Sequence, residues 1–236
     1  MKIRFGQNLV LLFGLSLLIS LTAEVRAGDS PASDFPWVYS YEGDVIPQAA
    51  DPGWIKLYAS EPLESVKAGI LTIKSTREQQ ARFELDEPQE YWGVLPEVGS
   101  PAIGVTLESR VRVVDSVGPD CPAAMLSFYS EGYRMFLHLF PDKITISGGS
   151  GGKAGVCAMD TTDKFHVYRI TAIGSNIKLY ADNNPAPVID LANGLSPATK
   201  SSRIYFGDAD SARTGGESQW DYLRWTNKGV YPPASK

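Results

Sequence analysis

The fold is decided by residues 124–140, which read AMLSFYSEGYRMFLHLF. Plain apolar residues alternate there with chemically richer ones. The apolar positions are Leu126, Phe128, Met135, Leu137 and Leu139, and the positions between them include Ser127, Tyr129, Arg134, Phe136 and His138. Because successive side chains of a strand point to opposite faces, the stretch predicts two strands, each with one buried and one open face. The two-residue connection Glu131-Gly132 predicts an antiparallel hairpin.

The run Val105–Val113 repeats this alternation, with Glu108, Arg110 and Arg112 on the open side. An open sheet surface bearing arginines is a candidate ligand site, because the guanidinium fork pairs with carboxylate or sulfate. We expect one site lined by Arg110, Arg112, Tyr129, Arg134 and His138, with Trp92 on its rim. The alternative is a solvated face on which the arginines pair with Glu108 and Glu131.

Short strands fill the rest of the chain. Further candidates are Trp37–Glu42, Trp54–Tyr58, Ile70–Lys74, Ala81–Asp86, Lys143–Ser147, Phe165–Ala172, Asn176–Ala181, Val188–Leu191, Arg203–Gly207 and Trp220–Thr226. No segment sustains a helical period, and Gly148–Gly155 is expected to be a flexible loop. Many short strands between turns predict an all-β sandwich, best fitted by a jelly roll, and the aromatic-rich first and last runs are expected to pair and close a sheet edge.

The chain begins with the pattern of an export signal. Lys2 and Arg4 precede the apolar stretch Leu9–Leu21, and Val25-Arg26-Ala27 offers a cleavage site. The apolar stretch is shorter than the roughly 20 residues of a spanning helix, which favours cleavage over a membrane anchor. We expect a signal peptide at 1–27, a linker at 28–34, one domain at 35–231 and a tail at 232–236. The mature protein would be secreted or periplasmic, with no membrane span.

Charge and cysteine content narrow the function classes. Removing residues 1–27 lowers the formal net charge from −5 to −7, because that segment carries three basic residues and one acidic residue. This balance argues against a nucleic-acid partner, which needs a basic surface. In an oxidising compartment Cys121 and Cys157 predict one disulfide, and two free thiols are the alternative. Metal binding through them is disfavoured, since neither has a CxxC partner.

Several segments carry a resemblance to a known family. They are Tyr41-Glu42-Gly43-Asp44, Asp163–Ile170, Ile177–Asn183, Phe206-Gly207-Asp208 and Trp220–Arg224. These segments resemble the concanavalin A-like lectin/glucanase superfamily in its laminin G-like, secreted bacterial form, over essentially all of residues 35–231. The resemblance implies an antiparallel jelly-roll β-sandwich whose concave sheet commonly holds carbohydrate. The same sandwich carries lectins, hydrolases, lyases and inert modules, so it specifies the fold better than the function.

The resemblance also implies what an enzyme would need. The superfamily's glucanases carry an E-x-D-x-x-E strand motif that this chain lacks, and glycosidases need two carboxyl groups about 5 to 10 Å apart. Jelly-roll lyases use arginine to neutralise a uronate while histidine and tyrosine move protons, roles that would fall to Arg112, His138 and Tyr129. However, the lyases' Q-[IV]-H strand reads Phe136-Leu137-His138 here, and their Y-x-K-x-G-x-Y strand is missing.

A structural calcium ion is a second candidate. Glu42 and Asp44 end the first predicted strand and Asp221 lies in the last, so pairing of those strands could bring together the hard oxygen ligands that calcium prefers. The alternative is turn chemistry for Asp44 and an edge charge for Asp221. His166 is expected to be a structural histidine, hydrogen-bonded near a strand start.

The sequence therefore predicts an exported concanavalin A-like β-sandwich that binds a glycan, with acidic glycans favoured and calcium optional. Two alternatives stay open. One is a polysaccharide-degrading enzyme, either a uronate lyase or a glycoside hydrolase, that uses the same sheet face. The other is an adhesion or structural module without a small ligand.

Overall fold

The computed structural model describes residues 37–57, 63–76, 82–86, 100, 102–130, 133–148, 153–197, 203–208 and 215–235. Residues 36–236 form one compact unit. The predicted signal peptide, the predicted linker and Trp92 lie outside the described residues. In the described part of the chain, no helix has the length and apolar character that a membrane crossing requires.

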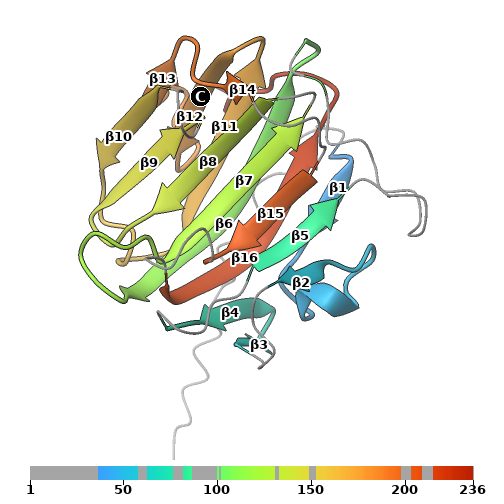
Figure 1. The fold of residues 1–236 in the computed structure, drawn as a ribbon, viewed down its shortest axis with the longest axis vertical. Helices are drawn as coiled ribbons and strands as arrows, with labels where there is room; N and C mark the ends of the chain where they lie inside the picture. Colours follow the sequence, from blue (N-terminus) through green and yellow to red (C-terminus); the bar gives the residue numbers. More distant parts are fainter. Residues whose placement is uncertain are drawn as a thin grey trace, which may run out of the picture. The chain divides into compact units, whose positions relative to one another are not determined.

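Two antiparallel sheets make up this unit (Figure 1). Sheet A has the order β13 (Ile189–Leu191), β12 (Asn176–Ala181), β11 (His166–Ile173), β6 (Val105–Ser116), β16 (Gly216–Thr226), β4 (Ile70–Lys74) and β3 (Glu64–Lys67), with β1 (Tyr39–Tyr41) also paired to β16. Sheet B has the order β10 (Ala154–Ala158), β9 (Lys143–Ser147), β8 (Tyr133–Leu139), β7 (Ala124–Ser130), β15 (Arg203–Gly207), β5 (Arg82–Asp86) and β2 (Ile55–Leu57), with β14 (Ser196–Pro197) paired to β8. A 3-10 helix, η1 (Pro47–Ala49), precedes β2.

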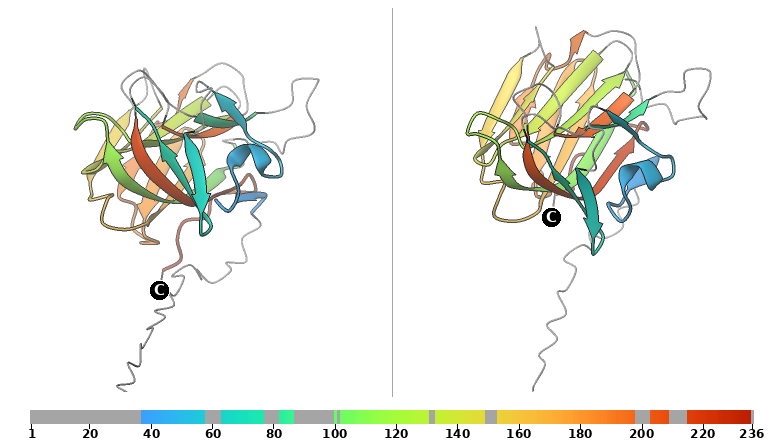
Figure 2. Two further views of the ribbon diagram at one scale, coloured as in Figure 1. Left: turned by 90° about the horizontal axis from the view of Figure 1, so that it is seen from below. Right: turned by 60° about the horizontal axis from the view of Figure 1, so that its bottom comes forward.

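The main core lies between the sheets, which form two layers (Figure 2). The ring centroid of Phe206, in sheet B, lies 4.9 Å from that of Trp220 and 5.6 Å from that of Tyr41, both in sheet A. Alternate residues along the strands, such as Leu107 and Phe128, are 0% exposed. Burying each such side chain contributes about 1.5–3 kcal/mol, so the alternation selects the two facing surfaces.

The structure confirms the predicted all-β sandwich and most of its strands. Strands β4, β7, β9, β12 and β15 have the predicted bounds. In contrast, β6 runs past Val113 to Ser116, and β16 begins at Gly216, because these two strands pair with each other there. Strands β3, β10 and β14 were not predicted, and β10 begins inside the expected loop Gly148–Gly155.

The predicted pairing of the first and last runs is confirmed. Tyr39 lies opposite Trp225, and Tyr41 lies opposite Leu223. However, β16 also pairs with β6 and β4 and is therefore interior to sheet A, so this pairing does not close a sheet edge.

Candidate functional site

The structure divides the five predicted site residues between the two sheets. Arg110 and Arg112 lie on β6 in sheet A, whereas Tyr129, Arg134 and His138 lie on β7 and β8 in sheet B. In each sheet they alternate with residues of the shared core, so the two sets face away from each other. The prediction of one site lined by all five residues is therefore wrong.

On sheet A the two arginines serve the fold. Arg110 forms an ion pair with Asp221 on the neighbouring strand β16. Arg112 donates from Nε to the carbonyl oxygen of Thr162 at 2.9 Å. These contacts support the alternative that the arginines of this face pair with groups of the protein itself. Their partners are Asp221 and Thr162, whereas the sequence analysis named Glu108 and Glu131.

Glu108 holds a buried polar network on the same face of sheet A. Its Oε2 accepts a hydrogen bond from Arg169 Nε at 2.6 Å, and its Oε1 accepts one from the Tyr222 hydroxyl at 3.0 Å. Glu108 is 4% exposed, and Arg169 and Tyr222 are each 7% exposed. Burial, followed by the charge of Glu108, raises the pKa of Tyr222 well above its ordinary value. A buried ion pair needs this degree of hydrogen bonding, so the network is a structural element.

A second group of aromatic and basic residues lies on the outward face of sheet B. Met125, Phe136 and Tyr205 form a buried cluster separate from the main core, and Tyr129 packs against it. The ring centroid of Tyr129 lies 6.0 Å from that of Phe136 and 5.6 Å from that of Tyr205. These rings form an aromatic layer on the side of the sheet that faces away from sheet A.

Three arginines from three different strands stack over this layer. The guanidinium carbons lie 4.3 Å from the Tyr205 centroid for Arg82, 5.3 Å from the Tyr129 centroid for Arg203 and 5.7 Å from the Phe136 centroid for Arg134. His138 continues the surface, with its ring parallel to that of Phe136 and the centroids 6.1 Å apart. Stacking on a ring orients the plane of a guanidinium group and therefore the directions of its N–H groups. We term the set Arg82, Tyr129, Arg134, Phe136, His138, Arg203 and Tyr205 the arginine–aromatic face.

Strand register arranges this face in rows across the sheet. The first row is Arg134, Tyr129, Arg203 and Asp86, on β8, β7, β15 and β5. The second is Ser147, Phe136, Ser127, Tyr205 and Glu84, and the third is Thr145, His138, Met125, Gly207 and Arg82. Neighbours within a row lie about 5 Å apart, and successive rows lie about 7 Å apart. The first row thus carries an arginine on each side of a tyrosine.

A hydrogen bond between two tyrosines sets the polarity of the face. The hydroxyl of Tyr205 donates to the hydroxyl oxygen of Tyr129 at 3.1 Å. Tyr205 is 3% exposed, and its burial, together with this hydrogen bond, raises its pKa well above the ordinary value. Tyr205 therefore keeps its proton, and the half-buried Tyr129 has its own O–H left to donate.

The structure does not assemble the trio predicted for a lyase. Arg112 lies on the other sheet. Tyr129 belongs to the first row of the face and His138 to the third, which places them about 13 Å apart along the strands. Groups that move protons at one sugar carbon must both lie within hydrogen-bond reach of it, so this set cannot act together.

The described side chains of the arginine–aromatic face include no carboxylate. Glu84 and Asp86 belong to its rows by backbone register. A glycosidase needs two carboxyl groups flanking the scissile bond. The described side chains can therefore hold a saccharide, but they do not form a hydrolytic pair among themselves.

The predicted calcium ligands are not gathered into a metal site. Glu42 pairs with Arg224 at 2.8 Å, Asp221 pairs with Arg110, and Asp44 is exposed. Burial opposes ionisation of Glu42, but hydrogen bonds led by that from Arg224 hold its pKa below the ordinary value. Among the residues that the structure describes, no three His, Cys, Asp or Glu side chains meet in a metal-binding arrangement. The residues present therefore do not fit calcium as predicted.

The predicted disulfide is not formed, and both cysteines are free thiols. Register places Cys157 of β10 in one row with Ile144, Leu139 and Ala124 of β9, β8 and β7. Three strand spacings amount to about 14 Å, and Cys121 lies just before β7. A disulfide needs Cα atoms within about 7 Å, so the two intervening strands keep the thiols apart.

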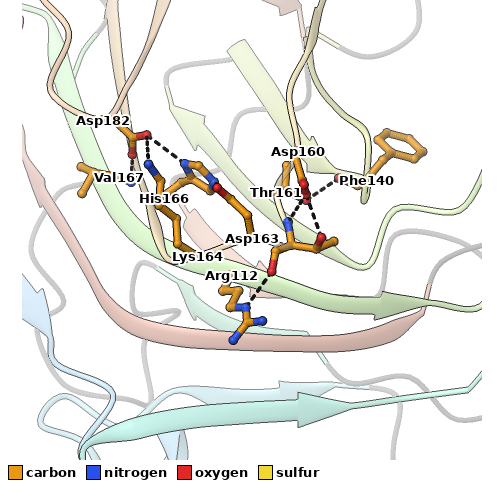
Figure 3. Close-up of polar contacts among 10 residues, drawn as sticks. Arg112, Phe140, Asp160, Thr161, Asp163, Lys164, His166, Val167 and Asp182 are labelled. Carbon is orange, nitrogen blue, oxygen red and sulfur yellow. Dashed lines mark hydrogen bonds and ion pairs between the residues drawn. The ribbon is translucent and has the colours of Figure 1, made fainter. Parts of the chain in front are cut away.

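His166 has the structural role that the sequence predicts. It begins β11, and its Nδ1 lies 2.9 Å from Asp182 Oδ2 while its Nε2 lies 2.7 Å from Asp163 Oδ1 (Figure 3). Asp182 also accepts the backbone N–H of Val167 at 3.1 Å. These contacts join the start of β11 to the turn after β12.

The adjoining loop links the two sheets (Figure 3). Thr161 is 0% exposed, and its hydroxyl donates to the carbonyl oxygen of Phe140, next to β8 of sheet B, at 2.6 Å. Its backbone N–H donates to Pro141 O at 3.1 Å. Its carbonyl oxygen accepts the N–H of Val113, in β6 of sheet A, at 3.1 Å.

Sequence reasoning placed Phe136 on an open face but not in the site, and it missed three members of the arginine–aromatic face altogether: Arg82, Arg203 and Tyr205. All three lie in predicted strands, and Arg203 and Tyr205 alternate with core residues as Arg134 and Phe136 do. This alternation was the available signal. The alternation does not show that β15 pairs with β7, because this pairing joins segments about 75 positions apart in the chain.

No protein-family model matches this chain, and no curated protein matches it. Solved structures do match. An endo-1,3-β-glucanase from Streptomyces sioyaensis superposes with a TM-score of 0.53 at 12% identity, over 80% of this chain and 95% of that chain. A laminarinase from Flavobacterium sp. UMI-01 gives a TM-score of 0.53 at 13% identity, over 80% and 99%. A glycosyl hydrolase family 16 protein from Mycobacterium smegmatis gives 0.51 at 14% identity, over 80% and 100%.

At these identities the similarity concerns the fold. The two antiparallel sheets of this chain and their jelly-roll arrangement are common to these glucanase-type structures. This chain therefore has the antiparallel jelly-roll β-sandwich fold that the glucanase and laminarinase structures share.

Proposed function

We propose that this chain binds polysaccharide on the arginine–aromatic face of sheet B. The observation that carries the proposal is the stack of three guanidinium groups over one aromatic cluster, on the open side of a jelly-roll sheet. Stacking fixes the hydrogen-bond donors before a ligand arrives, which reduces the entropy cost of binding. Phe136 and Tyr205 are only 9% and 3% exposed, so a ligand would meet the arginines, Tyr129 and His138.

The length of the face suits a polymer. Its three rows extend about 13 Å along the strands, which is longer than a single sugar ring. The similar solved structures include proteins named as a glucanase and a laminarinase, which supports a polysaccharide ligand.

Cleavage of the bound polysaccharide is a second candidate, and the comparisons favour it over a purely lectin-like role, since the similar structures are named as glycosyl hydrolases. Register places the backbones of Glu84 and Asp86 in the rows of Tyr205 and Arg203, which makes these two positions the ones to substitute in a test of cleavage.

Affinity electrophoresis tests the binding proposal. Gels would contain laminarin, lichenan, alginate or chondroitin sulfate, and we expect at least one to retard the protein. Arg203→Gln should reduce the retardation, whereas Arg224→Gln, which removes the same charge from sheet A, should not. Equal retardation of both variants, or no retardation by any polymer, would overturn the proposal.

Product release tests cleavage with the same polymers. Hydrolysis releases reducing ends, and we expect Glu84→Gln or Asp86→Asn to abolish the release. Elimination instead produces an unsaturated product that absorbs in the ultraviolet. Binding without either product would reject cleavage and leave the binding proposal in place.

A further inference from the structure

We propose that two copies of this chain associate through strand β10, by antiparallel pairing of β10 with β10 of the second copy. Strand β10 forms one end of sheet B (Figure 1). Among the residues that the structure describes, it pairs with β9 alone. Its other side therefore presents a row of backbone N–H and C=O groups with which another strand can pair.

The ladder between β10 and β9 shows which backbone groups face the open edge. Met159, just after the strand, donates its backbone N–H to the carbonyl oxygen of Asp142 at 3.0 Å, which makes these two a hydrogen-bonded pair. Such pairs recur at every second residue of an antiparallel ladder, so the backbone groups of Cys157 and Gly155 also point to β9. The other residues of the strand direct their N–H and C=O groups to the open edge: Ala154, Val156 and Ala158. The Cys157 thiol lies 3.6 Å from the Ala158 carbonyl oxygen, but a thiol is a weak donor that a backbone N–H can replace.

The side chains of β10 lack the charges that protect a sheet edge from pairing. The two sheets end in four strands, and the other three each carry a charged residue: Lys56 in β2, Asp190 in β13 and Lys67 in β3. Strand β10 is the longest of the four, with 5 residues, and none of them is charged. Val156 is 65% exposed, more than any other large apolar side chain in the described part of the chain. Charge discourages pairing at an edge, so β10 is the end best suited to it.

The open edge of β10 is complementary to itself. Its residues read Ala, Val, Ala in either direction, so antiparallel pairing centred on Val156 sets Val156 opposite Val156 and Ala154 opposite Ala158 of the second copy. The two residues of each such pair exchange both backbone hydrogen bonds. Lys153 precedes the strand and Asp160 follows it, so the pairing brings the basic end of each copy beside the acidic end of the other. A two-fold interface requires this self-complementarity, which makes a second copy the matching partner.

The pairing would join the outward faces of two sheets B into one surface, a consequence that rests on the proposed function. The third row of the arginine–aromatic face continues from His138 through Thr145 to Val156. Directly opposed residues in antiparallel strands have their side chains on the same face, so the row would run on into the second copy. The two His138 backbones would be five strand spacings, about 24 Å, apart. One polysaccharide chain could then contact both copies, which raises its affinity through effective concentration.

Sedimentation of the mature protein tests the association, from about 1 to about 300 µM, because a dimer forms by mass action. We expect a monomer–dimer equilibrium that Val156→Lys weakens at least about tenfold, since it sets two like charges opposite each other. Ile55→Lys is the matched control, because Ile55 is 53% exposed on β2 at the opposite end of sheet B, and it should dimerise as the wild type does. A monomer at every concentration, equal dimerisation of Val156→Lys and wild type, or equal loss in both variants would overturn the proposal.

Disulfide crosslinking tests the register without adding a charge. The Cα atoms of a hydrogen-bonded pair lie about 5.5 Å apart, a distance that a disulfide spans. Oxidation of Val156→Cys/Cys157→Ser should therefore give a covalent dimer, whereas Ile55→Cys/Cys157→Ser should not. Cys121, which is 8% exposed, is common to both variants. A protein that dimerises but does not form this crosslink would overturn the pairing centred on Val156.

Polysaccharide binding separates this inference from the proposed function. If both hold, Val156→Lys should bind a long polymer more weakly than the wild type does, and a short oligosaccharide of the same sugar equally well. A dimer that none of the polymers retards would support the interface and reject the proposed function. A monomer that a polymer retards would reject the interface and leave the proposed function in place.

Discussion

The buried ion pair of sheet A gives a strong test of the structure. We consider Glu108→Gln, which keeps the shape of the side chain and removes its charge. In the wild type, Glu108 is 4% exposed and accepts hydrogen bonds from Arg169 and Tyr222. The substitution removes the carboxylate that pairs with the 7%-exposed Arg169.

The expected cost follows from this burial. Removing one partner of a buried ion pair destabilises a protein by about 3–5 kcal/mol. The pair Glu42–Arg224 on the same sheet supplies the control, because its side chains are 48% and 27% exposed. An exposed pair contributes about 0–1 kcal/mol, so Glu42→Gln should have little effect.

Urea unfolding and thermal melting measure both variants. For a domain of this size, the expected loss for Glu108→Gln lowers the melting temperature by about 6–20 °C. The double variant Glu108→Gln/Arg169→Met removes the buried positive charge as well and should recover part of the stability. If Glu108→Gln melts within about 2 °C of Glu42→Gln, the argument for a buried pair is refuted.

The other predictions concern the loop, the pH dependence and the thiols. Thr161→Val leaves the Phe140 carbonyl oxygen without its hydroxyl donor and should lower the free energy of unfolding in urea by about 1–3 kcal/mol. The control Thr162→Val, one position along, should lower it by about 0.5 kcal/mol or less. Equal losses would contradict the linking role of Thr161. Burial opposes ionisation of Asp182, but the hydrogen bond from His166 and the other contacts hold its pKa below the ordinary 3.8. The stabilisation by this carboxylate is therefore present above about pH 4 and is lost as the pH falls through the folded pKa. Melting temperatures measured against pH should show a shallower acid loss in Asp182→Asn than in the wild type, and an identical profile would reject the contact. In the native protein a thiol reagent should label the half-buried Cys157 fast and Cys121, which is 8% exposed, slowly. If the denatured, unreduced protein contains no free thiol, the two cysteines form a disulfide and the structure is wrong on this point.

Local alternation predicted the strands because burial of one face leaves a period of two in the sequence. The same alternation could not assign a strand to a sheet, since a strand with one buried face reads alike in either layer. Val105–Val113 and Ala124–Ser130 therefore look equivalent, yet the first pairs with β11 and β16 and the second with β8 and β15. Grouping the arginines of the first run with Tyr129 of the second, and with residues of the adjoining β8, into one site failed for this reason.

The same limit explains the errors on the disulfide and the calcium site. The compartment argument for Cys121 and Cys157 contains no distance, and two strands lie between them. For calcium, the terminal strands pair as expected, which brings Glu42 and Asp221 onto neighbouring strands. The arginines that engage them come from sheet partners that only the fold brings near.

Carbon-13 labelling of the tyrosines tests most directly whether polysaccharide contacts sheet B. Tyr129 belongs to the arginine–aromatic face, whereas Tyr180 and Tyr222 lie on the outward side of sheet A and serve as internal controls. On titration with a fragment of the bound polysaccharide, the ring signals of Tyr129 should shift while those of Tyr180 and Tyr222 stay in place. Shifts at Tyr222 with an unmoved Tyr129 would place the ligand on the opposite sheet and contradict the account.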